Sequence, residues 1–482
     1  MLMLIVGWAI NGEVLANSPA GLDARSPVGA YLDGHVPDNS DQPMPALLSQ
    51  TGAFSNPLSL ETSAGLVPYD VNSALWSDNA IKTRWIALPY DGTAASPVIQ
   101  FSATGSWTFP VGTVFVKHFA LKVDERTGAA NPVRRLETRI LVRNADGSYR
   151  GATYRWRSDN SDADLVGAST NETITITATD GSTHNQTWLY PGPEDCMRCH
   201  TANAGRVLGV KTAQLNGNFL YHQPGSLPDR TDNQLHTWFH LGMFDNAMAD
   251  SATGNYPALP HMVAVDDGSA AIEDRVRSYL DANCAHCHRP GGEGTKFDAR
   301  FDTALAQQNI IAPGSNNFNG LIRNNVSASR LYIRDASLAS PMPPLARNIV
   351  DTRILDAYSE WANLPFSVAS LTETAPTQLR VQFTQAVDPV TAADLSNYVL
   401  RDMVGNVVNV YAVTLDANPA VVILTTPALV PGFTYQLTAN GIMQQQAPFN
   451  RLWLNSAVSF EKPLSVDGIY RGMQIREHAS LN

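Results

Sequence analysis

A chain of 482 residues is too long for one hydrophobic core and predicts about three domains. A formal net charge of −11 disfavours a nucleic-acid-binding protein, because a phosphate backbone attracts basic surfaces. Charged residues make up only 16% of the chain, below the usual quarter or so, which favours a secreted, β-rich protein.

The N-terminus begins with an apolar run, residues 2–9, and Val14-Leu15-Ala16 ends in the small residues that a signal peptidase accepts. We therefore predict a signal peptide over residues 1–16. The alternative is an ordinary N-terminal segment, since no basic residue precedes the run and Asn11 and Glu13 interrupt it. No segment is long enough to predict a membrane span.

Residues 17–45 are rich in Pro, Gly, Asp and Ser and predict a linker. Residues 46–190 predict an antiparallel β-domain. Its clearest hairpin has alternating residues from Leu136 to Val142, a turn at Asp146-Gly147 and a return strand from Tyr149 to Trp156. Basic side chains here suit carboxylate partners, and the candidates are Arg84, Arg155 and Arg157.

All four cysteines fall in two pentapeptides of one pattern. These are Cys196-Met197-Arg198-Cys199-His200 and Cys284-Ala285-His286-Cys287-His288. C-x-x-C-H is the attachment pattern of c-type haem, in which both sulfurs bond the porphyrin and the His binds the iron. We therefore predict two covalently bound haem c groups, with Cys196, Cys199, Cys284 and Cys287 as attachment residues and His200 and His288 as iron ligands.

Two other interpretations use the same cysteines. A zinc site built from two C-x-x-C pairs would leave both histidines without a role. A thioredoxin-like dithiol needs one such pair beside a βαβ pattern and does not explain two. With 11 histidines in the chain, a His directly after each pair favours haem.

Residues 191–265 form the first predicted haem region, and residues 266–364 a cytochrome c-like second haem domain. In the latter, a helix with apolar positions from Ile272 to Leu280 precedes Cys284, and Asp351 begins a closing helix. Between them Met342 lies among prolines, which restrict the loop, so its thioether is the predicted sixth ligand of the second haem.

The sixth ligand of the first haem is less clearly marked. Met243 and His240 are the two candidates, because both follow on or near a predicted helix over 233–243 close to the first pentapeptide. A five-coordinate iron is the alternative and would leave an open position for catalysis.

Residues 366–460 predict an immunoglobulin-like β-sandwich without cysteines, a docking module for a surface or protein partner. Its expected strands include Leu379 to Phe383, Val421 to Leu424 and Tyr435 to Ala439. Residues 461–482 form a tail without a recognisable pattern. The fold class expected overall is multidomain α+β, with an N-terminal antiparallel β-domain, a central mostly α region and this C-terminal sandwich.

Several segments together resemble an uncharacterised family of bacterial di-haem c-type cytochromes over roughly residues 45–365. They are YDVNSALWSDNAIKTRW, FPVGTVFVKHF, YRWRSDNSDADLV, YPGPEDCMRCH and RVRSYLDANCAHCHRPGG. The resemblance implies the same six cysteine and histidine roles. Residues 379–441 resemble, more weakly, Ig-like repeats of bacterial surface proteins.

The expected function is single-electron transfer between redox protein partners in the periplasm or outside the cell, where bacteria attach haem c. One alternative is a di-haem oxidoreductase of the peroxidase type, with His236 or His240 as the acid/base group at an open first haem. In another alternative, the sandwich carries the main function by binding a surface polymer or a protein partner, and the haems are only carried along.

Overall fold

The structure is a computed structural model that describes residues 20–28, 38–93, 96–130, 132–223, 225–245, 256–312, 314 and 317–464. The signal peptide predicted over residues 1–16 and most of the tail after residue 460 lie outside these ranges. The chain divides into two compact units. The first comprises Met1–Val265, Arg277–Ala304 and Ile333–Ile354, and the second Asp266–Val276, Leu305–Tyr332 and Leu355–Asn482.

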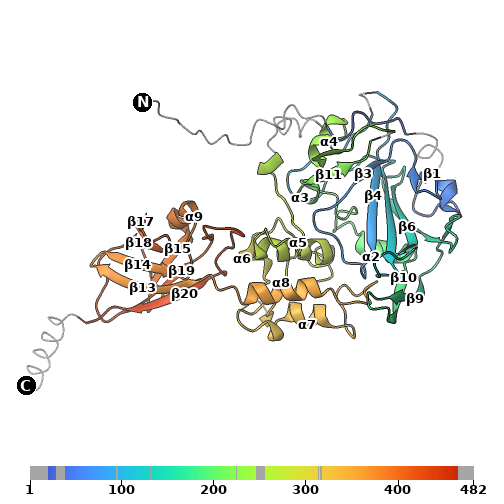
Figure 1. Cartoon of the computed structure of the whole chain (residues 1–482). Helices are drawn as coiled ribbons and strands as arrows, with labels where there is room; N and C mark the ends of the chain where they lie inside the picture. Colours follow the sequence, from blue (N-terminus) through green and yellow to red (C-terminus); the bar gives the residue numbers. More distant parts are fainter. Residues whose placement is uncertain are drawn as a thin grey trace, which may run out of the picture. The chain divides into compact units, whose positions relative to one another are not determined.

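A six-stranded antiparallel sheet dominates the first unit (Figure 1). Its order is β3 (Val67–Tyr69), β4 (Ile81–Ala87), β5 (Val114–Lys122), β6 (Val133–Arg143), β7 (Tyr149–Trp156) and β8 (Ala163–Leu165). Three two-stranded sheets accompany it: β1 (Phe54–Asn56) with β2 (Glu61–Thr62), β9 (Thr170–Thr177) with β10 (Thr183–Tyr190), and β11 (Asn218–Tyr221) with β12 (Arg230–Asn233).

The β6–β7 hairpin confirms the strand pair predicted from alternation. Leu136, Ile140 and Val142 are buried on β6, and Arg143 pairs with Tyr149 at the turn end. Gly147 adopts φ 82°, a left-handed conformation that glycine enters without a steric penalty, so the turn predicted at Asp146-Gly147 forms as expected.

Short helices and loops make up the central part of the chain. The helices are α2 (Pro193–Cys199), α3 (Thr212–Leu215), α4 (Gln234–His240), α5 (Ile272–Cys284), α6 (Leu305–Gln308), α7 (Arg330–Ala336) and α8 (Thr352–Ala362). The longest, α5, has 13 residues. The expected fold class, with a central mostly α cytochrome c-like region, is therefore wrong: turns and loops separate these helices, and β-structure predominates among the described residues.

An aromatic core lies between the six-stranded sheet and α4. Trp238, on α4, is fully buried, and its ring centroid lies 5.7 Å from that of Tyr69 on β3 and 6.1 Å from those of Trp107 and Phe244. Asn233 begins α4 by accepting a hydrogen bond from the Leu235 backbone N–H at 2.9 Å. Ile86 on β4 and Phe115 on β5 belong to the same core, so it includes residues of strands that line the site described below.

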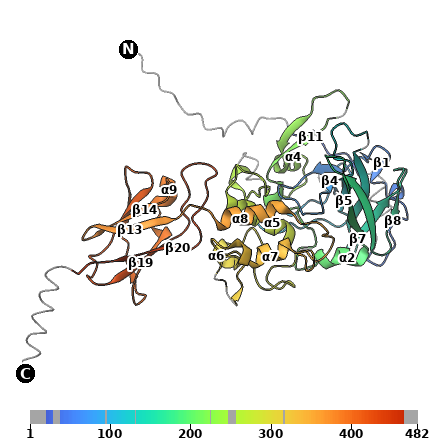
Figure 2. The same ribbon diagram turned by 60° about the horizontal axis from the view of Figure 1, so that its bottom comes forward.

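The second unit ends in two four-stranded antiparallel sheets (Figure 2). One has the order β13 (Val368–Ala375), β14 (Gln378–Phe383), β18 (Val421–Thr425), β17 (Ala412–Leu415); the other has β16 (Val407–Val408), β15 (Tyr398–Asp402), β19 (Thr434–Ala439), β20 (Ser456–Glu461). A short helix, α9 (Pro389–Ala393), precedes β15. The three strands predicted from alternation are present as β14, β18 and β19. Among the described residues, no helix has the length and apolar character needed to cross a lipid bilayer.

Candidate functional site

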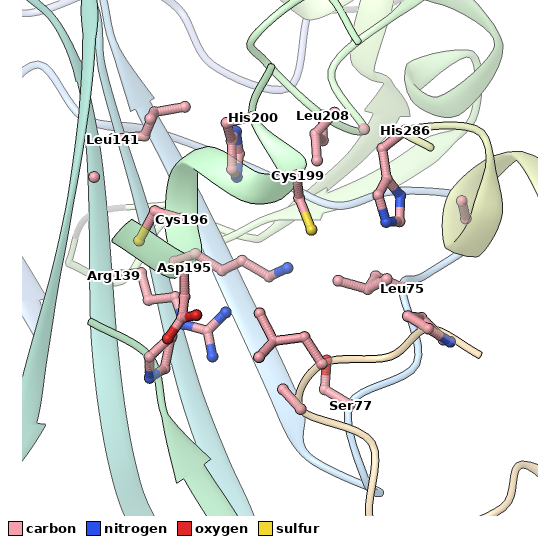
Figure 3. A pocket seen from close by; sticks show the side chains of 18 of the residues that line it. Leu75, Ser77, Arg139, Leu141, Asp195, Cys196, Cys199, His200, Leu208 and His286 are labelled. Atoms are coloured by element: carbon pink, nitrogen blue, oxygen red, sulfur yellow. The ribbon is translucent and has the colours of Figure 1, made fainter. Parts of the chain in front are cut away.

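A cavity of the first unit has a volume of about 240 Å³ and lies between α2, the strand face of β4–β6 and two later segments. The first pentapeptide contributes Cys196, Cys199 and His200 to its wall, and the second contributes His286 and Cys287. Figure 3 shows the Cys199 sulfur and the His286 ring directed toward the same space. Two segments far apart in the sequence therefore meet at one cavity.

Helix α2 positions the first pentapeptide. Pro193 stands in the first turn, where a missing backbone N–H costs no helical hydrogen bond, and Glu194 and Asp195 complement the positive end of the helix. The helix packs against β7, and the Cys196 thiol donates to the Gly192 carbonyl at 3.6 Å. Cys196 is thus held beside the sheet, while Cys199 faces the cavity.

Gly151 on β7 is the residue that lets α2 approach so closely. A Cβ added at this position would lie 2.6 Å from Cys196 Cβ and 2.8 Å from its Sγ, closer than unbonded atoms approach. We expect Gly151→Ala to destabilise the protein by about 1–3 kcal/mol through overpacking. Chemical denaturation measures the loss, and Gly167→Ala is the control, because a Cβ at Gly167 would have nothing within 4 Å and its backbone is not left-handed. Equal stability of the Gly151 variant and wild type would contradict this packing.

His200 ends α2 and is oriented by a backbone carbonyl. Its Nδ1 lies 2.6 Å from the Arg206 carbonyl oxygen, so Nδ1 carries the proton and donates it to that oxygen, while Nε2 keeps a free lone pair. Burial lowers the His200 pKa to about 4, which keeps the imidazole neutral at physiological pH. A neutral, oriented imidazole is a good ligand or hydrogen-bond partner for a bound molecule.

The thiols are held in their protonated form. Burial raises the pKa of Cys199 to about 11, with a further contribution from the neighbouring Cys287, whose own pKa burial also raises. Burial raises the pKa of Cys196 and of Cys284 as well. Because the thiolate is the reactive form of cysteine, these raised pKa values make the thiols weak nucleophiles.

The second pentapeptide presents one predicted residue, Cys287, and one that was not predicted, His286, to the cavity. His286 and Cys287 line the cavity, whereas the His288 ring stacks on Phe297 with centroids 4.2 Å apart and planes inclined at 21°. Gly294 closes the other side, since a Cβ there would lie 2.4 Å from His288 Nδ1. The predicted iron ligand is packed between neighbours, and His286, which the pattern did not single out, takes the place on the cavity wall.

The predicted sixth ligands lie away from the cavity wall. Met243 is fully buried in the aromatic core around Trp238. His240 Nε2 is 3.0 Å from the Asp23 carbonyl oxygen, with which it shares a hydrogen bond. His236, the other acid/base candidate, is held by the Asp232 carboxylate at 2.9 Å. Met342 lies in the loop between α7 and α8. The next five residues of that loop, from Pro343 to Arg347, line the cavity, and Met342 does not.

Of the three arginines expected to bind carboxylates, only Arg84 lines the cavity. Arg155 forms an ion pair with Glu172 at 3.0 Å, and Arg157 forms one with Asp164 at 2.6 Å. Lys117 and Arg139 also line it, and the sequence analysis did not identify them. One sequence signal could have identified them: each is a basic residue in a strand whose neighbouring residues are largely apolar.

No protein-family profile matches the sequence. No curated protein matches it either. Among solved structures, the N-terminal part of the bacterial S-layer protein SbsC is 20% identical with a TM-score of 0.20, and the match covers 27% of this chain and 31% of that one. For domains 1–6 of SbsC the values are 19%, 0.19, 26% and 18%. The matches thus span less than a third of either S-layer chain, and TM-scores this low establish no common fold.

These findings correct the assignment to the di-haem c-type cytochromes and the two covalently bound haem c groups. Within the part of the chain that the structure describes, no group of three or more His, Cys, Asp or Glu side chains is placed to hold a metal ion. The pentapeptides share one cavity instead of forming two centres, and His288 is packed against Phe297. The donor set found here does not fit two separate haem sites.

Proposed function

We propose that this chain is an exported redox protein that passes single electrons between protein partners, with the cavity of the first unit as its redox centre. The observation that carries the proposal is the convergence of Cys199, His200, His286 and Cys287 on that cavity. Sulfur and neutral imidazole are soft, polarisable groups that tune the potential of a redox-active molecule in contact with them.

The rest of the wall favours an organic guest molecule over a hydrated ion. Apolar side chains from several segments face the space: Val71, Leu75, Leu141, Leu208, Pro343 and Leu345. Apolar walls with a few convergent polar groups are the usual character of a cofactor or small-molecule site. Enclosure in such a medium also limits the reorganisation of water when the charge of the guest changes.

The remaining parts of the chain fit the same proposal. The two C-terminal sheets provide a separate surface for a protein or cell-surface partner, and the periplasm or the cell exterior is the proposed location. The low charged fraction supports this location.

The test is an anaerobic redox titration of the full chain, secreted and purified without added cofactor. We expect a reversible wave with a slope of about 59 mV per tenfold change in the ratio of oxidised to reduced protein, as a one-electron couple requires. His200→Ala should shift or abolish the wave. His222→Ala, whose ring is 79% exposed and bonded to Asp229, is the matched control and should leave it unchanged.

Three results would contradict the proposal. No wave would exclude a redox centre, and a slope near 30 mV would indicate a two-electron thiol–disulfide couple. A His222 effect equal to that of His200 would mean that the cavity is not the centre. Intact-protein mass spectrometry accompanies the titration, and a mass increment fixed to both pentapeptides would show that a group is covalently attached to each of them.

A further inference from the structure

We propose that the strand wall of the cavity is an oxyanion-binding site, so that its guest is a molecule with an apolar body and at least one carboxylate, sulfonate or phosphate group. The inference rests on the proposed function in one respect, namely that the cavity holds a guest. It adds the chemical class of that guest and the residues that recognise it.

Three basic side chains stand abreast on neighbouring strands. Arg84 on β4 is the register partner of Lys117 on β5, and Lys117 is the register partner of Arg139 on β6. Residues directly opposite one another in antiparallel strands point to the same face, with their Cβ atoms roughly 5 Å apart. All three line the cavity, so we call them the basic row.

Part of this positive charge is already balanced. Arg139 donates two hydrogen bonds to Glu137 Oε1, at 2.5 and 3.1 Å, and Arg84 pairs with Asp70, whose side chain is 55% exposed. Each arginine therefore has a carboxylate partner on the protein.

Lys117 is different. Within the described ranges, no residue accepts a hydrogen bond from its ammonium group. The Phe119 ring lies 5.0 Å away, and Glu137, the carboxylate whose charge attracts Lys117, accepts its hydrogen bonds from Arg139. Burial lowers the Lys117 pKa well below its usual value, and the neighbouring Arg84, Lys82 and Arg139 lower it further.

Lys82 adds further positive charge beside the basic row. It stands two residues before Arg84, on the same face of β4, and its ammonium group donates to the Leu75 carbonyl at 2.8 Å. Burial lowers the Lys82 pKa to about 7, again with the surrounding cations as further causes. Partly enclosed cations that repel one another are costly in the protein alone, and an anion in the cavity removes that cost.

The geometry suits one oxyanion at the centre of the row. An arginine presents a planar fork of N–H groups that matches two oxygens of a carboxylate, and a lysine adds a point charge between two such forks. The apolar walls opposite accept the remaining body of the guest. An inorganic anion alone would make no contact with the apolar walls, so the site favours an amphipathic molecule.

The test uses two fluorescent probes with related aromatic bodies: 8-anilinonaphthalene-1-sulfonate, which is anionic, and N-phenyl-1-naphthylamine, which is neutral. Binding is measured on the full chain and on Lys117→Met, which keeps the apolar length of the side chain without its charge. We expect the variant to bind the anionic probe roughly 10-fold more weakly, as for a lost charge-assisted hydrogen bond, and the neutral probe equally well. Lys117→Arg should restore anionic binding.

Equal weakening for both probes in Lys117→Met, or no change for either, would overturn the oxyanion site. Failure of Lys117→Arg to restore binding would overturn it as well. The redox titration separates this inference from the proposed function. A one-electron wave without probe discrimination refutes the basic row alone, and probe discrimination without a wave refutes electron transfer alone.

Discussion

Replacing Arg139 by Met is expected to destabilise the protein by about 3–5 kcal/mol at neutral pH, because it leaves the Glu137 carboxylate buried without its partner. Glu137 is fully buried, and the shorter of its two hydrogen bonds from Arg139 measures 2.5 Å. Methionine retains most of the apolar stem of Arg139, so the loss of the charge dominates the effect. Urea denaturation at pH 7 measures it.

The same variant should regain stability as the pH falls. Burial raises the Glu137 pKa above its ordinary value of 4.5 in the folded protein, and Arg139 opposes that rise. Without Arg139 the folded-state pKa rises further, while the unfolded-state pKa does not change. A carboxyl group whose pKa is raised by folding favours the folded state below its unfolded pKa, and this contribution is lost as the pH rises through the folded pKa.

Two further variants make this prediction specific. The double variant Glu137→Leu/Arg139→Met should recover most of the lost stability, because the Glu137 carboxylate is no longer buried without Arg139. Arg157→Met removes an exposed ion pair with Asp164 and should cost no more than about 1 kcal/mol. A double variant no more stable than Arg139→Met alone would show that the cost comes from lost packing instead.

Replacing Trp238 by Ala is expected to cost about 3–5 kcal/mol, as for other fully buried aromatic residues. The indole is fully buried and contacts Tyr69, Trp107 and Phe244, so its removal opens a hole that these three side chains cannot close by small shifts. Trp238→Phe should cost less, because most of the volume is kept. The midpoint of guanidinium denaturation reports both.

Leu220→Ala is the control for this pair, since Leu220 is 46% exposed on β11 and its truncation should change stability by no more than about 0.5 kcal/mol. A loss below about 1 kcal/mol in Trp238→Ala would show that the aromatic cluster is not a packed core. A loss equal in the Phe and Ala variants would point to the specific shape of indole instead of its volume.

Local patterns predicted the strands and the pentapeptide residues of the cavity, but they missed the alignment of the basic row. The alternation from Leu136 to Val142 and the turn at Gly147 act between near neighbours, so the β6–β7 hairpin could be read from the sequence. The basic row could not, because the alignment of Arg84, Lys117 and Arg139 depends on the register of three strands that long loops separate. Strand register is set by the whole buried face of a sheet.

The pentapeptides show the opposite difficulty. Their C-x-x-C-H pattern is strong, but it gives no information about the tertiary contacts that orient each histidine ring. The pattern treats His200 and His288 as equivalent, yet Arg206 orients one ring and Phe297 stacks on the other. Met243 is a similar case. The helix predicted to carry it ends at His240, and the Met243 backbone N–H then bonds to the Trp238 carbonyl, which leads its side chain into the aromatic core.

The walls of the cavity come from residues scattered between Tyr69 and Arg347, with both pentapeptides in between. A nascent chain therefore cannot form the complete cavity until residue 347 has been synthesised, almost three-quarters of the way along the sequence, and has folded back onto the strands. We therefore expect the proposed guest to bind only late in biogenesis, and a chain that ends before residue 343 lacks the part of the cavity wall formed by Pro343 to Arg347, however well its strands assemble.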